Sequence, residues 1–276
     1  MRRLFQYALT IVLLAGCTIT QQVIPVSYEP ATVRPSADRH DYQNAAKAIA
    51  YVMVEELKLP RVEAVLIIYP TRAEYESGFV AEVGSTPSQA AGRTHFLAMA
   101  NCKYKKVLVN GQSLSRLPWS SRVKTLAHEL THIAQYSLGN SRCSSPHSWL
   151  SEGFANWAAF KVVESLGLDT FAKERETFVE SVYKLKSNRT LPALSQMAVS
   201  SDWEYLAKSL GADATYAQSF LAVDFLIEKK SLPAVIEYFS LFARSNNRNV
   251  NFMTAFGEDV SVFEQEFGAH LQKLLI

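Results

Sequence analysis

The chain has few of the features that mark nucleic-acid-binding or membrane-spanning proteins. It carries no run of basic residues and no base-stacking motif, and its formal net charge is only +2 over 276 residues. Its N-terminal apolar run, 4–14, is too short to span a bilayer comfortably. We therefore expect no nucleic-acid partner, and a near-neutral chain has no strong field for selecting charged substrates.

The composition is that of a globular protein, with 48% hydrophobic and 20% charged residues. A chain of this length can bury one sizeable core. We find no internal repeat, no low-complexity run and no clear linker after residue 37. We therefore predict a single domain over 38–276.

The first residues have the layout of an export signal. Arg2 and Arg3 precede the apolar run, which ends in Leu14-Ala15-Gly16-Cys17. This ending resembles the lipobox of bacterial lipoproteins, which implies cleavage before Cys17 and attachment of lipid to it. The alternative is an ordinary secretory signal with an incidental cysteine. Losing Arg2 and Arg3 would leave 26 of the 28 basic residues, against 26 acidic ones.

The resemblance divides the N-terminus into a signal peptide, 1–16, and a lipidated segment, 17–37. We expect the second part to be an extended tether, because it is rich in proline and has little periodicity. Thr18 stands where an Asp favours inner-membrane retention in some Gram-negative bacteria. The resemblance therefore implies a lipid-anchored protein of the cell envelope, held in the outer membrane and facing the periplasm.

Only two cysteines remain after Cys17. Export implies an oxidising compartment, so Cys102 and Cys143 could form a disulfide. Two separate thiols are the alternative, because the sequence gives no distance between them.

Hydrophobic periodicity predicts an α+β fold with a helical second half. We expect a helix over 38–58, a strand over 62–69, a helix over 71–84, a loop over 85–92, and strands over 93–100 and 105–109. Two further helices follow, one ending at Leu138 with Ser120 or Ser121 as its cap, and one over 149–166 with Ser148 as its cap. The remaining chain predicts helices over 170–186, 201–210, 212–229, 232–243 and 260–274.

The first of the two middle helices carries His128-Glu129-Leu130-Thr131-His132. Residues four apart share a helix face, so His128 and His132 can bind one ion together. Glu129 lies beside them, where a general base for a metal-bound water is needed. Glu152, in the first turn of the next helix, would complete a His₂Glu zinc site, and the small Gly153 after it allows close packing.

The alternative is a helix with two incidental histidines and a neighbouring carboxylate. Three features argue against it: the motif lies opposite an apolar helix face, a second helix begins within a short loop of it, and that helix carries Glu152 in its first turn.

These residues resemble the gluzincin zinc metallopeptidases. The spacing from His132 to Glu152 is thermolysin-like, and Trp149-Leu150-Ser151-Glu152-Gly153-Phe154-Ala155 is similar to the peptidase MA-like families. The resemblance implies a zincin-like domain over 38–276 in which His128, His132 and Glu152 bind Zn²⁺. It implies Glu129 as catalytic base and 93–100 as an edge strand that pairs with substrate. The exopeptidase motif Gly-Ala-Met-Glu-Asn is absent.

Four further residues enter through the same resemblance. Asn156 stands where the thermolysin-like pattern has an Asp that orients a ligand histidine. Tyr216 is the expected donor to the oxyanion, and a packing role is its alternative. His147 is a second candidate donor, otherwise an exposed loop residue. His95 is expected on the edge strand, where it could touch substrate.

The resemblance as a whole implies a peptide or protein as substrate and a membrane contact through the lipid alone. It predicts an enzyme, a zinc endopeptidase of the cell envelope. Two alternatives stay open: a non-catalytic scaffold or chaperone with the same fold, and a hydrolase of peptidoglycan peptides. A pure scaffold has no need of Glu129.

Overall fold

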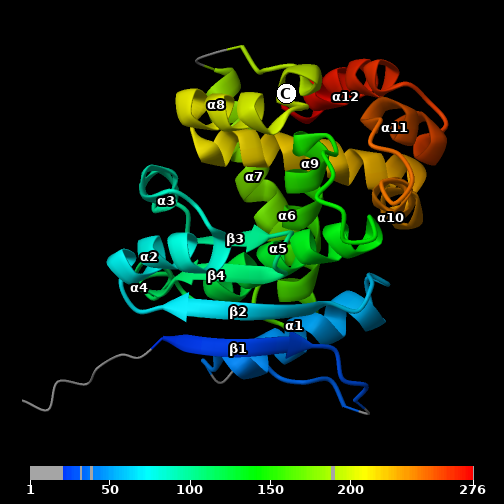
Figure 1. Ribbon diagram of the computed structural model, residues 1–276. Helices are drawn as coiled ribbons and strands as arrows, with labels where there is room; N and C mark the ends of the chain where they lie inside the picture. The colour runs from blue at the N-terminus through cyan, green and yellow to red at the C-terminus, as the bar shows by residue number, and fades with distance from the viewer. Residues whose placement is uncertain (1–20, 32, 38–39, 188–189, 276) are drawn as a thin grey trace, which may run out of the picture.

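A computed structural model describes residues 21–31, 33–37, 40–187 and 190–275. The expected signal peptide and the lipid attachment at Cys17 lie outside these residues. Within them the protein is α+β, with a four-stranded sheet early in the chain and a helical second half (Figure 1). Among the described residues, no helix is both long and apolar enough to cross a membrane.

The sheet has the strand order β1-β2-β4-β3. The strands are β1 (Gln22–Ser27), β2 (Glu63–Tyr69), β3 (Ala98–Asn101) and β4 (Lys106–Asn110). β2 and β4 run parallel, while β1 and β3 pair antiparallel with them at the two edges. The later helices lie on the side of β3, and β1 lies at the far edge (Figure 1).

Strand β1 corrects the expected tether over 17–37. Gln22 to Ser27 pair with Ile68 to Glu63, so this segment belongs to the domain. Ile24 and Val26 are buried against the core, which gives the period-two pattern of a half-buried strand. Pro25 obscured that pattern, although proline is tolerated on an edge strand because no ladder hydrogen bond is lost there.

Helices cover both faces of the sheet. α2 (Arg72–Val83) and the short α3 (Pro87–Arg93) and α4 (Gly111–Leu114) follow the strands on one side. α1 (Tyr42–Glu55) and α5 (Trp119–Leu138) pack on the main core. Leu66 faces that core, whereas Ile67 faces Tyr75 and Phe79 of α2, so β2 is buried on both sides.

The expected loop over 85–92 and strand over 93–100 are wrong. Residues 87–93 form α3, and β3 is confined to Ala98–Asn101. Thr86 and Gln89 form a capping box with Pro87 at the first helical position, which is a helix-start signal. His95 consequently lies in the turn between α3 and β3 rather than on the strand.

The second half contains seven α-helices among the described residues. They are α6 (Ser148–Ser165), α7 (Phe171–Lys186), α8 (Ser200–Leu210), α9 (Ala212–Lys230), α10 (Leu232–Leu241), α11 (Arg248–Phe256) and α12 (Val260–Leu274), with a 3₁₀ turn, η1, at Leu194–Met197. α11 was not expected from the sequence. The predicted caps also differ: α5 begins after Pro118, Ser148 is itself helical, and neither helix has a side-chain cap.

Helix α6 is the centre of the helical half, because it packs against both α5 and α9. Trp149, Phe154 and Phe160 of α6 are fully buried. Gly153 allows the approach to α9, since a Cβ there would lie 2.2 Å from the carbonyl oxygen of Ser219. This contact fixes α6 and α9 relative to each other within the core.

Candidate metal centre

Three side chains from two helices meet at the predicted metal site. His128 and His132 project from α5, and Glu152 projects from the first turns of α6. The two Nε2 atoms lie 3.1 Å apart. Glu152 Oε2 lies 3.4 Å from Nε2 of His128 and 3.5 Å from Nε2 of His132. These three residues could hold a metal ion.

The far nitrogen of each imidazole faces an amide oxygen. His128 Nδ1 lies 3.1 Å from Oδ1 of Asn156, and His132 Nδ1 lies 2.9 Å from Oε1 of Gln135. Because an amide oxygen can only accept, both histidines carry a proton on Nδ1, so Nε2 of each neutral imidazole would present its lone pair to an ion. Asn156 thus has the orienting position that the sequence predicted.

Gln135 was missed by the sequence analysis, although it lies three residues after His132 on the same face. Its orientation is set by α6: Nε2 donates to the carbonyl oxygen of Ser151, and Oε1 accepts from the Ser151 hydroxyl. The amide oxygen is therefore held toward His132. Sequence spacing indicated the face, but the partner that orients the amide comes from another helix.

The donor set fits a tetrahedral cation. An ion with ligand bonds of about 2.1 Å separates any two ligands by about 3.4 Å. The observed separations of 3.1, 3.4 and 3.5 Å lie around that value. Two lone pairs and a carboxylate oxygen this close repel one another unless a cation or a proton lies between them.

The charges at the site are strongly coupled. Burial alone would raise the pKa of Glu152, but His132 and His128 lower that pKa far below its usual range. Burial would likewise lower the pKa of His132, whereas the Glu152 carboxylate raises it to about 9. In the metal-free protein a proton on His132 therefore compensates the charge of Glu152, and metal binding must displace that proton.

Glu129 lies beside the ligands and is buried against the edge strand. Its Oε2 accepts the backbone N–H of Ala100 in β3 at 2.6 Å. Burial raises the pKa of Glu129, while His128 and His132 act in the opposite direction. The hydrogen bond fixes the plane of the carboxylate, and no hydrogen bond from the described residues occupies Oε1.

Tyr216 of α9 reaches the same site. Its ring centroid lies 5.9 Å from that of His128, and Trp203 of α8 packs edge-on against it at 4.6 Å. Burial and the nearby Glu152 and Glu129 raise the pKa of Tyr216 well above its usual value, so its hydroxyl stays protonated. Among the described residues that hydroxyl has no hydrogen-bond partner, which leaves it available as a donor.

His147 does not belong to this site, and the alternative of an exposed loop residue is wrong as well. It is buried, with Nδ1 2.9 Å from the hydroxyl of Tyr238 and Nε2 3.0 Å from Oδ1 of Asn249. It forms the N-cap of α6 and links that helix to α10 and α11.

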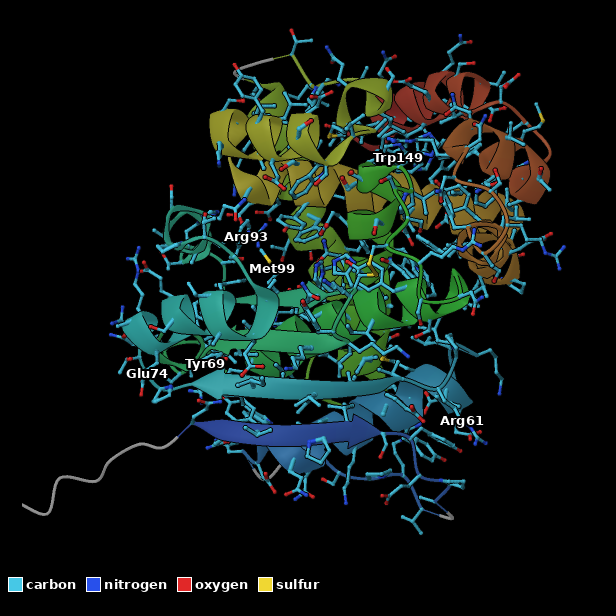
Figure 2. The ribbon with its side chains drawn as sticks, viewed as in Figure 1. Arg61, Tyr69, Glu74, Arg93, Met99 and Trp149 are labelled. Carbon is cyan, nitrogen blue, oxygen red and sulfur yellow. A yellow bond between two sulfur atoms is a disulfide. The ribbon has the colours of Figure 1, made fainter. Side chains whose placement is uncertain are left out.

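Two cavities meet at the metal centre. The larger, of about 850 Å³, extends past Phe160, Phe178 and Met99, and the turn with His95 lines it. Arg93 and Met99, on this side of the site, can be located in Figure 2. The smaller, of about 360 Å³, extends toward the loop between α5 and α6. Ala98 and Met99 of β3 line both, so the edge strand runs along the whole cleft.

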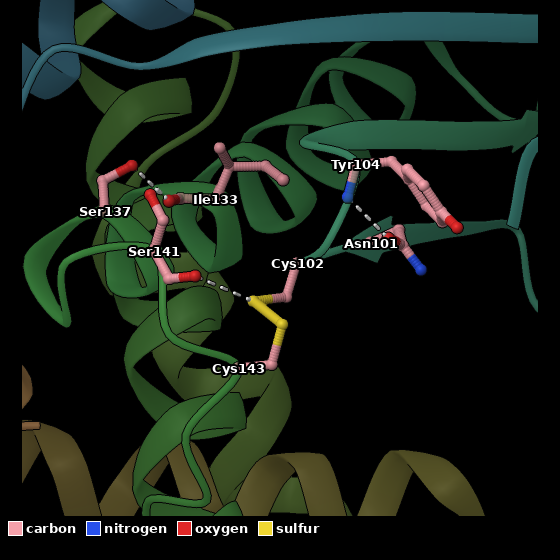
Figure 3. Close-up of a disulfide and its surroundings, with 7 residues drawn as sticks. All are labelled: Asn101, Cys102, Tyr104, Ile133, Ser137, Ser141 and Cys143. Atoms are coloured by element: carbon pink, nitrogen blue, oxygen red, sulfur yellow. Dashed lines mark hydrogen bonds between the residues drawn. A yellow bond between two sulfur atoms is a disulfide. The ribbon is translucent and has the colours of Figure 1, made fainter.

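A disulfide joins Cys102 to Cys143, with a Cα–Cα distance of 5.6 Å (Figure 3). Cys102 directly follows β3, and Cys143 lies in the loop between α5 and α6. The bond therefore ties the edge strand to the loop whose Ser144 and Pro146 line the smaller cavity. Of the two arrangements left open by the sequence, the structure has the bridge.

Comparisons with protein-family models, with curated proteins and with solved structures gave no match for this chain. The chemistry of the site is therefore interpreted from its own geometry.

Proposed function

We propose that this protein is a zinc-dependent metallopeptidase with a zincin-like fold, similar to the gluzincins. The observation that carries the proposal is the set of three donor atoms 3.1–3.5 Å apart, with both imidazole rings oriented by amide oxygens. Two histidines and one carboxylate leave a fourth tetrahedral position open, which is typical of catalytic rather than structural zinc.

The metal and the base have separate tasks. A zinc ion held by His128, His132 and Glu152 would polarise the scissile carbonyl and lower the pKa of a water to about 7. Glu129 takes the proton of the attacking water, because burial raises its pKa and so favours the protonated form. The same carboxyl group then delivers that proton to the leaving amine.

Two other groups bind and orient the substrate. β3 is an edge strand, so its unpaired side would offer backbone hydrogen bonds to an extended peptide, a mode that needs no particular side chain. The Tyr216 hydroxyl donates to the carbonyl oxygen as negative charge develops on it. A protonated phenol suits that role, since only the protonated form can donate.

We also propose that the protein is exported and held in the bacterial cell envelope by lipid on Cys17, because the Leu14-Ala15-Gly16-Cys17 ending resembles a lipobox. The disulfide between Cys102 and Cys143 is consistent with an oxidising compartment. Labelled palmitate incorporated by cells that produce wild type but not Cys17→Ser would support this; equal incorporation would contradict it.

The central test is cleavage of a proteome-derived peptide library by purified protein, with and without chelator. Glu129→Gln should keep stoichiometric zinc and lose about 10²–10⁴-fold in kcat. His132→Ala should lose the zinc itself. Glu176→Gln, on an exposed position of α7, is the matched control and should change neither. Chelator-insensitive cleavage would refute the metal mechanism, no cleavage would favour a scaffold, and cleavage of muropeptides alone would favour a cell-wall enzyme.

A further inference from the structure

The two cavities at the metal centre differ in chemistry. The larger one is walled by apolar side chains, including Leu97, Phe160 and Phe178. The smaller one is lined by hydroxyl groups, from Ser144, Ser145, Ser148, Ser151 and Ser200, and by one arginine, Arg248. Nothing in the proposed hydrolysis requires this difference, so it bears on which substrates bind.

Arg248 is a partly buried cation without a counter-charge. It is the first residue of α11, and its Nη1 donates to the carbonyl oxygen of Ala198 at 2.6 Å. No acidic side chain among the described residues forms an ion pair with it. A guanidinium group has five N–H donors in a planar fork, so most of its hydrogen-bonding capacity remains for a ligand.

The N-terminus of α6 lies beside this arginine. The backbone N–H of Ser148 donates to the same Ala198 carbonyl oxygen, at 3.0 Å. The Ser148 nitrogen and Arg248 Nη1 are therefore both within hydrogen-bond distance of one atom. α6 has no side-chain cap at its start, but its Ser148, Leu150 and Ser151 N–H groups are already bonded to the carbonyl oxygens of Ala198 and His147, so a ligand would be held by the guanidinium group and the nearby hydroxyl groups.

Three carboxylates line the smaller cavity, those of Glu129, Glu152 and Glu204, and Glu204 accepts a hydrogen bond from Ser200 at 3.2 Å. Arg248 lines only the smaller cavity. Within the larger cavity, Lys124 is already paired with Glu174 at 2.6 Å. Arg93 and Lys208 of the larger cavity also form no ion pair among the described residues, whereas Arg248 is the single Lys or Arg side chain that lines the smaller cavity.

We propose that Arg248 and the hydroxyl group of Ser148, at the start of α6, form a carboxylate-binding subsite next to the candidate metal centre. The inference rests on the proposed peptidase function and names its substrate class: peptides with a carboxylate on one side of the cleaved bond. A round cavity of 360 Å³ is about 9 Å across. At about 3.5 Å per extended residue, the carboxylate lies within about three residues of that bond.

The carboxylate can come from an Asp or Glu side chain or from the free C-terminus of the substrate. Four fluorogenic peptide series separate these sources: Asp or Asn moved through three positions on either side of the cleaved bond, each with a C-terminal acid or amide. We expect wild type to prefer the carboxylate by about tenfold or more in kcat/KM, since a hydrogen bond to a charged group contributes that much. A side-chain preference would indicate an endopeptidase and a terminal preference an exopeptidase.

Arg248→Gln should abolish the preference, measured as the ratio of kcat/KM for the acidic peptide to that for the neutral peptide, while the zinc content stays unchanged. Arg248→Lys keeps the charge without the fork and should retain part of the preference. Arg244→Gln, an exposed position before α11 that lines neither cavity, is the matched control. Equal cleavage of acidic and neutral peptides by wild type, or a preference that survives Arg248→Gln, would overturn the subsite.

A binding measurement separates failure of the subsite from failure of the peptidase function. Fluorescence anisotropy of labelled Asp and Asn peptides with the zinc-loaded protein needs no turnover. Stronger binding of the Asp peptide that is lost in Arg248→Gln would support the subsite even if no peptide were cleaved. Equal binding of the two peptides would refute it whatever the activity.

Discussion

Replacing Gly153 by alanine tests the contact that holds α6 against α9. A Cβ at this position would lie 2.2 Å from the Ser219 carbonyl oxygen and 2.8 Å from Cγ2 of Val223. A carbon–oxygen contact needs about 3.3 Å, so the two helices must separate by about 1 Å. The atom in the way is backbone, so rotation of a side chain cannot relieve the clash.

The stability change is a balance of two effects. Overpacking in a core costs about 1–3 kcal/mol, and a backbone clash lies at the upper end. Alanine gains about 1 kcal/mol over glycine inside a helix. We therefore expect Gly153→Ala to lower the free energy of unfolding by about 1–2 kcal/mol. Urea denaturation of the metal-free protein measures this without a contribution from metal binding.

The same substitution should reduce activity. Tyr216 lies one turn before Ser219 on α9, so a shift of α9 moves its hydroxyl away from the metal centre. A displacement of about 1 Å can cost about 100-fold in rate. Gly268→Ala in α12, where a Cβ would meet nothing within 4 Å, is the matched control and should stabilise by about 0.5–1 kcal/mol. If Gly153→Ala were stabilised to the same extent, the close approach of α6 and α9 would be refuted.

Three further predictions concern the surroundings of the site. Replacing Cys102 and Cys143 by serine should lower the free energy of unfolding by about 4 kcal/mol, because the disulfide closes a loop with a 41-residue separation. Chemical reduction of the wild-type protein should have the same effect. A wild-type protein whose stability does not change on reduction would contradict this prediction. Burial lowers the pKa of His147 to about 4, so between pH 6.5 and 4 the unfolded chain binds a proton that the folded protein does not. The free energy of unfolding should therefore fall by up to about 3 kcal/mol as the pH drops through that window. Urea titrations at each pH measure this fall, and it should be absent in His147→Gln. Gln135→Met removes the acceptor for His132 Nδ1–H and should weaken zinc binding by about 10–100-fold in competition with a chromophoric chelator, whereas unchanged affinity would show that the hydrogen bond does not orient the ligand.

The cluster that could hold a metal ion was predictable because the relation between its two histidines is local. His128 and His132 lie one turn apart on one helix. The apolar residues that form the buried face of that helix occur in the same stretch of sequence. Glu152 required one more step, the packing of the next helix, and Gly153 beside it signalled that this packing is close. Both helices were predicted, the first of them with its apolar face, although their caps were not.

The errors arose where pairing partners are distant in the sequence. β1 is a strand because β2 lies beside it, and 35 or more residues separate the partners. Its own residues, interrupted by Pro25, do not show a strand clearly. The strand predicted over 93–100 failed for a different reason: the capping box of Thr86 and Gln89 was present in the sequence but was not recognised.

The surroundings of the candidate metal site likewise depend on contacts between segments that are distant in the sequence. The residue type determines which hydrogen bonds a side chain can make. Whether the side chain is free to bind a ligand depends on which of its donors and acceptors are already bonded to neighbouring residues. Gln135 orients His132 because Ser151 holds the amide, and Tyr216 can donate because no described residue accepts from it. Arg248 offers a free fork for a carboxylate because its one hydrogen bond goes to a carbonyl group and not to an acid. Local sequence therefore predicts the cluster of possible metal-binding residues, whereas the proposed substrate preference depends on contacts between helices that are far apart in the chain.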